Sequence, residues 1–168
     1  MKKNKKIYLL CLCALFSALI FIATMIHAPI GVNGGYIHLG DGVLYLCAAI
    51  LPTPYAIAAG VIGGGLSDIL GGAPAWVWAT VIIKGLSALF FTSKKEKIIC
   101  AQNVVALFIG AVLCVGGYYL AEVVIYSCGF VIPIASIPFN IVQTVSSAVI
   151  FLIIGAVFDK TNIRKKVL

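Results

Sequence analysis

Charged side chains are scarce in this sequence: Asp, Glu, Lys and Arg make up 10% of its 168 residues, and hydrophobic types make up 62%. Soluble domains carry about 25% charged residues and about 45–50% apolar ones. This composition excludes a soluble enzyme, a disordered chain and a nucleic-acid-binding module, so we expect no nucleic acid among the partners. The composition indicates an integral membrane protein, and residues 1–168 are interpreted as a single membrane domain.

The sequence also lacks the patterns that identify common catalytic sites. It has no G-x-S-x-G element, no Cys–His motif, no phosphate-binding loop and no C-x-x-C pair. His38 and Asp41 form an H-x-x-D pair, but this spacing is not a known metal-ligand pattern, and the chain has only two histidines. We therefore expect no catalytic residues, no metal and no cofactor. The six cysteines lie mostly in apolar runs and are interpreted as small hydrophobic residues.

Basic residues gather in three clusters, at 2–6, 94–97 and 160–166, separated by apolar runs. A run of about 20 apolar residues can span a bilayer as a helix. The fold class predicted is an all-α membrane protein with six transmembrane helices, at about 7–28, 41–51, 55–70, 76–91, 98–126 and 136–158. Six spans place both termini on one side, and the positive-inside rule makes that side cytoplasmic. Of the twelve basic residues, only Lys84 then lies within the membrane.

Two of the predicted helices, 41–51 and 55–70, are too short to span the bilayer unaided. At 1.5 Å per residue, helix 41–51 covers roughly 16 Å of a hydrocarbon core about 30 Å thick. The preceding loop, 29–40, contains four glycines and cannot easily extend that helix. Non-helical backbone at membrane depth is tolerated where it lines an aqueous cavity. We expect a cavity that opens outward, with this loop as its lid or wall; the alternative is local thinning of the bilayer.

Polar and aromatic side chains recur at helical spacing on the last three predicted helices, mostly in their outer halves. Aromatic walls with a few hydrogen-bonding groups are typical of a small-molecule site. The candidate ligand-binding residues on these helices are Trp76, Thr80, Lys84, Tyr119, Glu122, Asn140 and Gln143. The alternative for the polar members is a role as interhelical contacts only.

Lys84 needs an acidic partner because a charge within the membrane is costly. Glu122 is one candidate, and Asp41 and Asp68, at the outer ends of their helices, are the others. Asp41 has a second interpretation as the N-terminal cap of its helix. The pattern leaves open whether Lys84 and Glu122 contact a ligand or pair with each other.

Several segments, taken in order, resemble the substrate-binding S components of energy-coupling factor (ECF) vitamin transporters, and those of the riboflavin-transporter type most. The matching segments are A-x-x-x-A at Ala14–Ala18, GYIHLGD at 35–41, AAILP at 48–52, SDILGG at 67–72, IIKGL at 82–86, and ASIPFN at 135–140 with Gln143. Together they cover nearly the whole chain.

The resemblance implies a subunit in the cell membrane of a prokaryote that captures a water-soluble vitamin or precursor from outside. It implies that the first loop closes over the ligand, so Tyr36 and His38 join the candidate ligand-binding residues. The partners implied are a membrane coupling protein, two cytoplasmic ATPases and membrane lipid, with ATP hydrolysis reorienting the S component. Ala14 and Ala18 are the candidate docking residues, and the alternative for them is an internal helix contact.

Two other functions remain open at this point. A small membrane enzyme acting on lipid-like substrates would turn over a lipid without partners. A channel would carry polar stripes through the whole membrane, whereas these stripes are concentrated in the outer half.

Overall fold

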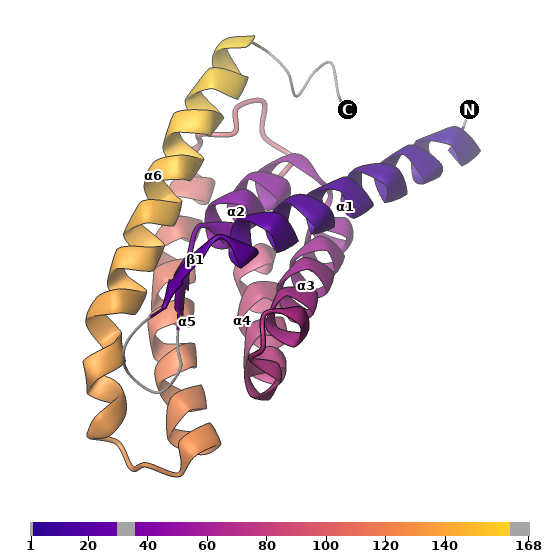
Figure 1. Cartoon of the computed structure of the whole chain (residues 1–168). Helices are drawn as coiled ribbons and strands as arrows, with labels where there is room; N and C mark the ends of the chain where they lie inside the picture. Colours follow the sequence, from indigo (N-terminus) through magenta and orange to yellow (C-terminus); the bar gives the residue numbers. More distant parts are fainter. Residues whose placement is uncertain (1, 30–35, 162–168) are drawn as a thin grey trace.

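The computed structural model describes residues 2–29 and 36–161, and these form six α-helices with a two-stranded sheet (Figure 1). The elements in order are α1 (Lys2–Met25), β1 (His27–Pro29), β2 (Tyr36–His38), α2 (Gly40–Ile50), α3 (Thr53–Leu70), the 3-10 turn η1 (Pro74–Trp76), α4 (Val77–Phe90), α5 (Ala101–Tyr126), the 3-10 turn η2 (Ile132–Ser136) and α6 (Ile137–Thr161). The all-α fold with six helices is confirmed. Three of the loop's four glycines, and three basic residues near the C-terminus, lie outside the described residues.

The first helix differs from the sequence prediction at both ends. α1 begins at Lys2 rather than residue 7, and it ends at Met25 rather than residue 28, because the chain turns into β1, which pairs antiparallel with β2. His27 lies opposite His38 in this pairing. The sheet therefore holds the second half of the first loop against the helices.

The short helix α2 lies inside the protein. Ten of its eleven residues are buried, and it packs against α1, α3, α4 and α6. Protein surrounds α2, so this helix does not need the length of a lipid-facing span. By length and composition, α1, α5 and the η2–α6 segment are each able to cross a membrane.

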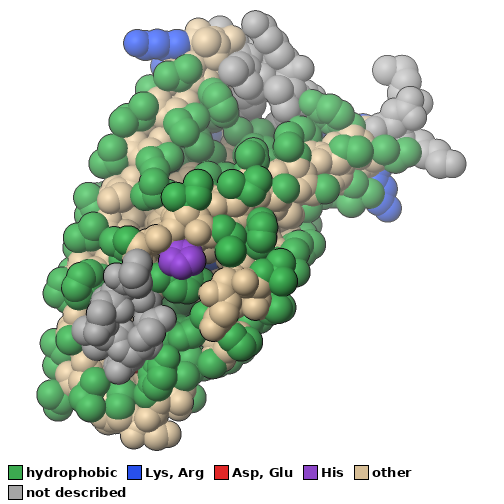
Figure 2. All heavy atoms as spheres, viewed as in Figure 1, with side chains coloured by type: hydrophobic (Ala, Val, Ile, Leu, Met, Phe, Trp, Pro, Cys, Tyr) green, Lys and Arg blue, Asp and Glu red, His purple; other side chains and the backbone are tan. Residues whose placement is uncertain are grey.

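The outer surface is apolar, as lipid contact requires. Figure 2 shows hydrophobic side chains over most of the visible face, with Lys and Arg at its upper left and right edges. Exposed residues such as Val112 on α5 and Ile153 on α6, at 72% and 61% exposure, belong to this surface.

Glycines in α3 allow α1 and α4 to approach it closely. A Cβ on Gly63 would lie 2.6 Å from the carbonyl oxygen of Ser17 on α1. A Cβ on Gly64 would lie 2.6 Å from Cε of Lys84 on α4. The glycine-rich sequence of α3 thus makes room for the α1 backbone on one side and for the Lys84 stem on another.

The connection between α4 and α5 is held by two polar side chains. Asn103 is fully buried; its side-chain oxygen accepts a bond from the N–H of Thr92, and its NH2 donates to the carbonyls of Thr92 and Ile98. The Asp159 carboxylate at the end of α6 accepts the N–H groups of Ile98 and Ile99, at 2.7 and 3.0 Å. These bonds fix the ends of α4, α5 and α6 relative to one another.

Candidate ligand site

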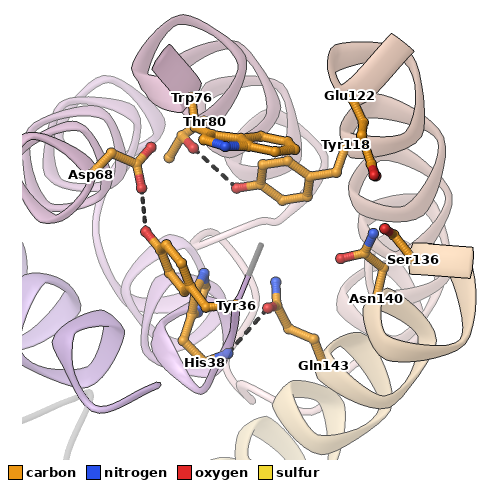
Figure 3. Close-up of a pocket in the computed structure, with 10 residues that line it drawn as sticks. All are labelled: Tyr36, His38, Asp68, Trp76, Thr80, Tyr118, Glu122, Ser136, Asn140 and Gln143. Atoms are coloured by element: carbon orange, nitrogen blue, oxygen red, sulfur yellow. Dashed lines mark hydrogen bonds between the residues drawn. The ribbon is translucent and has the colours of Figure 1, made fainter. Parts of the chain in front are cut away.

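A cavity lies where β2 meets the ends of α3, α4, α5 and α6 (Figure 3). The empty space around its lining residues, including space open to solvent, is about 510 Å³. The residues that line it are Tyr36, His38, Asp68, Trp76, Thr80, Tyr118, Glu122, Ser136, Asn140 and Gln143. Seven of the nine residues predicted from the sequence are among them.

The aromatic wall comes from η1 and α5. The rings of Trp76 and Tyr118 are 6.0 Å apart and inclined by 60°, and the hydroxyls of Tyr118 and Thr80 are 3.2 Å apart. Glu122 follows Tyr118 by four residues, one helical turn along the same face. These residues place aromatic surface beside polar atoms at one end of the cavity.

The structure places Tyr119 outside the cavity lining. Its hydroxyl donates to the carbonyl of Phe130 at 2.7 Å. Tyr118 lines the cavity instead. Adjacent tyrosines on a helix point about 100° apart, so only the rotation of α5 within the fold could select between them.

The opposite wall comes from α6, where the lining residues Asn140 and Gln143 are 7% and 2% exposed. Two further lining residues were not among the predicted ligand contacts. Ser136 lies at the end of η2, and Asp68 lies near the end of α3. In the sequence, Asp68 was identified as a possible partner of Lys84 and as part of the SDILGG segment, and Ser136 only as part of the ASIPFN segment; neither was predicted to contact the ligand.

Lys84 does not line the cavity, and its partner is Asp41. The Lys84 Nζ lies 2.6 Å from Asp41 Oδ1, and Lys84 is 1% exposed. The sequence left open whether Lys84 pairs with Glu122. In the structure, Lys84 pairs with Asp41 instead. The interpretation of Asp41 as the N-terminal cap of α2 is also wrong. The cap position is Leu39, and no side chain makes a capping hydrogen bond at this end of the helix.

Gln143 connects this ion pair to the first loop. Its Nε2 donates to Asp41 Oδ2 at 2.9 Å, and its Oε1 accepts the backbone N–H of His38 at 3.1 Å. A chain of bonds thus runs from α4 through α2 and α6 to β2. The position of the loop depends on an ion pair below the cavity.

The two loop side chains are tied to the cavity wall. The hydroxyl of Tyr36 donates to Asp68 Oδ1, and burial together with this carboxylate raises the pKa of Tyr36. His38 Nδ1 accepts the N–H of Gly40 at 3.1 Å. Burial, and next the Lys84 cation, lower the pKa of His38 to about 3, so the imidazole is neutral at physiological pH.

The candidate docking residues Ala14 and Ala18 both lie on an exposed face of α1. The opposite face, with Cys13, Ser17 and Ile20, is buried. The alternative that Ala14 and Ala18 make an internal helix contact is therefore not supported.

No group of three or more His, Cys, Asp or Glu side chains within residues 2–29 and 36–161 could hold a metal ion. The arrangement of aromatic, amide and carboxyl groups around a cavity is suited to reversible binding of a small molecule.

Comparison with known families decides the identity of the chain. The family model for the S component of the ECF-type riboflavin transporter matches residues 4–160. This chain belongs to that S-component family. A solved S component of a bacterial ECF transporter is similar in structure, with a TM-score of 0.68 and 20% identity, over 96% of this chain and 99% of that one. A comparison with curated protein sequences gives no match.

As an S component, the protein is the substrate-binding subunit of an ECF transporter and a multi-pass membrane protein. Partnership with an ECF module, made of a coupling protein and ATPases, follows at the level of the family. The order of segments that carried the sequence resemblance is thereby confirmed as a family relationship.

Proposed function

We propose that this S component captures a small, largely planar, water-soluble vitamin or vitamin precursor from outside the cell in the cavity beside β2. The observation that carries the proposal is the combination of the Trp76–Tyr118 aromatic pair with the Asn140 and Gln143 amides around one cavity. Aromatic rings accept a flat ligand, and placed hydrogen-bonding groups fix its orientation. Riboflavin, which appears in the family's name, is one member of this ligand class.

All the predicted ligand-site residues except Tyr119 have a role in this proposal. Trp76 packs against the ligand ring, with Tyr118 beside it in place of Tyr119. Thr80, Glu122, Asn140 and Gln143 offer polar contacts from three helices, and Tyr36 and His38 cover the ligand from the first loop. Lys84 acts indirectly. It holds Asp41 in position, and Asp41 in turn accepts a hydrogen bond from Gln143.

Delivery of the ligand requires partners. We propose that the exposed Ala14–Ala18 face of α1 docks on a coupling protein that carries two cytoplasmic ATPases, in the plasma membrane of a prokaryote with both termini cytoplasmic. ATP hydrolysis by those subunits reorients the S component, so the chain needs no catalytic residues or cofactor of its own. Small residues at a spacing of four allow a partner helix to approach closely in lipid.

A binding titration tests the capture step. Purified protein is titrated with a panel of vitamins and precursors, with the fluorescence of Trp76 as the signal and the Trp76→Phe variant measured in parallel to separate binding from quenching. At least one member should bind, and Asn140→Ala should weaken it by about tenfold, the loss expected for a hydrogen bond. Failure of every member to bind correctly folded protein would contradict the vitamin-capture function.

A further inference from the structure

Acidic side chains, but no basic ones, are found among the described residues that line the cavity. Two of its ten lining residues, Asp68 and Glu122, are acidic, and none is Lys or Arg. Lys84 is buried 2.6 Å from Asp41 Oδ1 and is not part of the lining. His38 is a neutral imidazole whose Nδ1 accepts the N–H of Gly40, so it adds no positive charge to the lining. The described lining residues therefore offer an anionic ligand no cationic side chain.

Asp68 retains the capacity to accept a hydrogen bond. It is 3% exposed, and its Oδ1 accepts a bond from the hydroxyl of Tyr36. Its Oδ2 is buried and makes no hydrogen bond of regular geometry among the described residues, although the Thr80 hydroxyl interacts with this carboxylate. A buried acceptor without a well-placed donor is costly, so a donor or a cation brought by the ligand would be stabilised here.

The aromatic residues favour the same sign of charge. Trp76 and Tyr118 form one tilted pair, and Tyr36 lies on the opposite side of the cavity in Figure 3. The faces of aromatic rings attract cations, Trp most strongly, and the attraction is larger where water is excluded. Glu122 lines the same cavity from α5 and is 2% exposed. Rings and carboxylates together form a lining of the kind that binds organic cations.

We propose that the cavity selects a heteroaromatic ligand that carries positive charge, as a protonated amine or a cationic ring nitrogen, and rejects vitamins that carry a free carboxylate. This inference rests on the proposed capture function and narrows its substrate class. Asp68 and Glu122 supply the complementary charge, and the rings of Trp76 and Tyr118 pack against the ligand. Selection works by exclusion as well, since a carboxylate ligand would meet two carboxylates and no cation.

The test compares ligands that share one ring and differ in charge. Pyridoxamine, pyridoxine and 4-pyridoxate are titrated into the purified full-length protein together with thiamine, riboflavin and biotin, and any compound released from the protein on denaturation is identified by mass spectrometry. The tightest ligand should be a cation. Asp68→Asn, which keeps an acceptor for Tyr36, and Glu122→Gln should each weaken that cation by about 10- to 100-fold.

Glu96→Gln is the matched control, because Glu96 is an exposed carboxylate in the connection between α4 and α5. It should leave affinity unchanged, and melting temperatures confirm that every variant is folded. The proposed selection for positive charge would be overturned if riboflavin or an anion were the tightest ligand. It would also be overturned if a cation bound equally well to both cavity variants. Either result would leave the vitamin-capture function intact. No binding by any compound to folded protein would instead overturn the capture function itself.

Discussion

At the scale of single residues, the ion pair of Lys84 and Asp41 is the most consequential contact, because it lies in the membrane-embedded core and supports Gln143. Removal of one partner from a buried pair leaves the other charge uncompensated, at a cost of roughly 3–5 kcal/mol. Asp41→Asn and Lys84→Met should each lower the melting temperature markedly, and the double variant should recover much of the loss. Thermal unfolding in detergent measures this. Additive losses in the double variant would show that the two residues do not act as a pair.

His38 predicts a dependence on acid pH. Its pKa is about 3 in the folded protein and about 6.5 when hydrated. Above pH 6.5 both states are neutral and the residue adds no pH dependence. Between pH 6.5 and 3 the unfolded or loop-open state takes up a proton that the closed state does not, so stability falls by about 1.4 kcal/mol per pH unit.

The closed loop should therefore lose about 2 kcal/mol between pH 7 and pH 5 through this group. Melting temperature and ligand affinity, measured across this range, should fall together. His38→Asn keeps a polar side chain but does not titrate, and it should flatten the profile. An equal decline in His38→Asn would assign the effect to the carboxyl groups instead.

At the scale of elements, α3 shows how a helix without large side chains organises the site. Gly64 provides the space for the Lys84 stem, and Lys84 cannot move aside because its ammonium is held by Asp41. Gly64→Ala should therefore destabilise the protein by about 1–3 kcal/mol, the usual effect of overpacking.

Gly116 on α5 is the matched control, since a Cβ there would meet nothing within 4 Å. Alanine is favoured over glycine within a helix by about 0.5–1 kcal/mol, so Gly116→Ala should be neutral or stabilising. Both variants are compared by thermal unfolding. A Gly64→Ala variant as stable as Gly116→Ala would show that Lys84 has room to yield.

At the scale of the whole molecule, binding and docking occupy different surfaces. The cavity is enclosed by β2 and helices α3 to α6, whereas Ala14 and Ala18 lie on the exposed face of α1. Replacement of both alanines by Trp should block assembly with the coupling protein and abolish uptake. Ligand affinity of the isolated protein should remain within about twofold, because distant sites act independently.

Val112→Trp, at an exposed position on α5, controls for the bulk of a new tryptophan on the lipid-facing surface. It should leave both assembly and uptake intact. Normal uptake by the Ala14→Trp, Ala18→Trp variant would refute the docking role, and equal loss of uptake in Val112→Trp would show a general effect of surface bulk.

Most of the candidate site could be predicted from helical spacing within single helices. Trp76 with Thr80, and Asn140 with Gln143, were predicted in this way and do line one cavity. Spacing failed where the decision lay between neighbours, as with Tyr118 and Tyr119, because rotation of a helix about its axis is set by packing against other helices. Asp68 entered the lining through a bond to the loop residue Tyr36, a contact across 32 positions that no local pattern encodes.

The sequence by itself determined the membrane class and the six helices. Long apolar runs must satisfy their backbone hydrogen bonds internally in lipid, and helices do so locally. The ordered segments also determined the family, which the family model confirms. Only the tertiary structure decided that Asp41 rather than Glu122 neutralises Lys84 and that Gln143 carries this pairing to the loop. The physical reason is that ion pairs and cavity walls join different helices, and close packing at residues such as Gly64 sets the depth and rotation at which those helices meet.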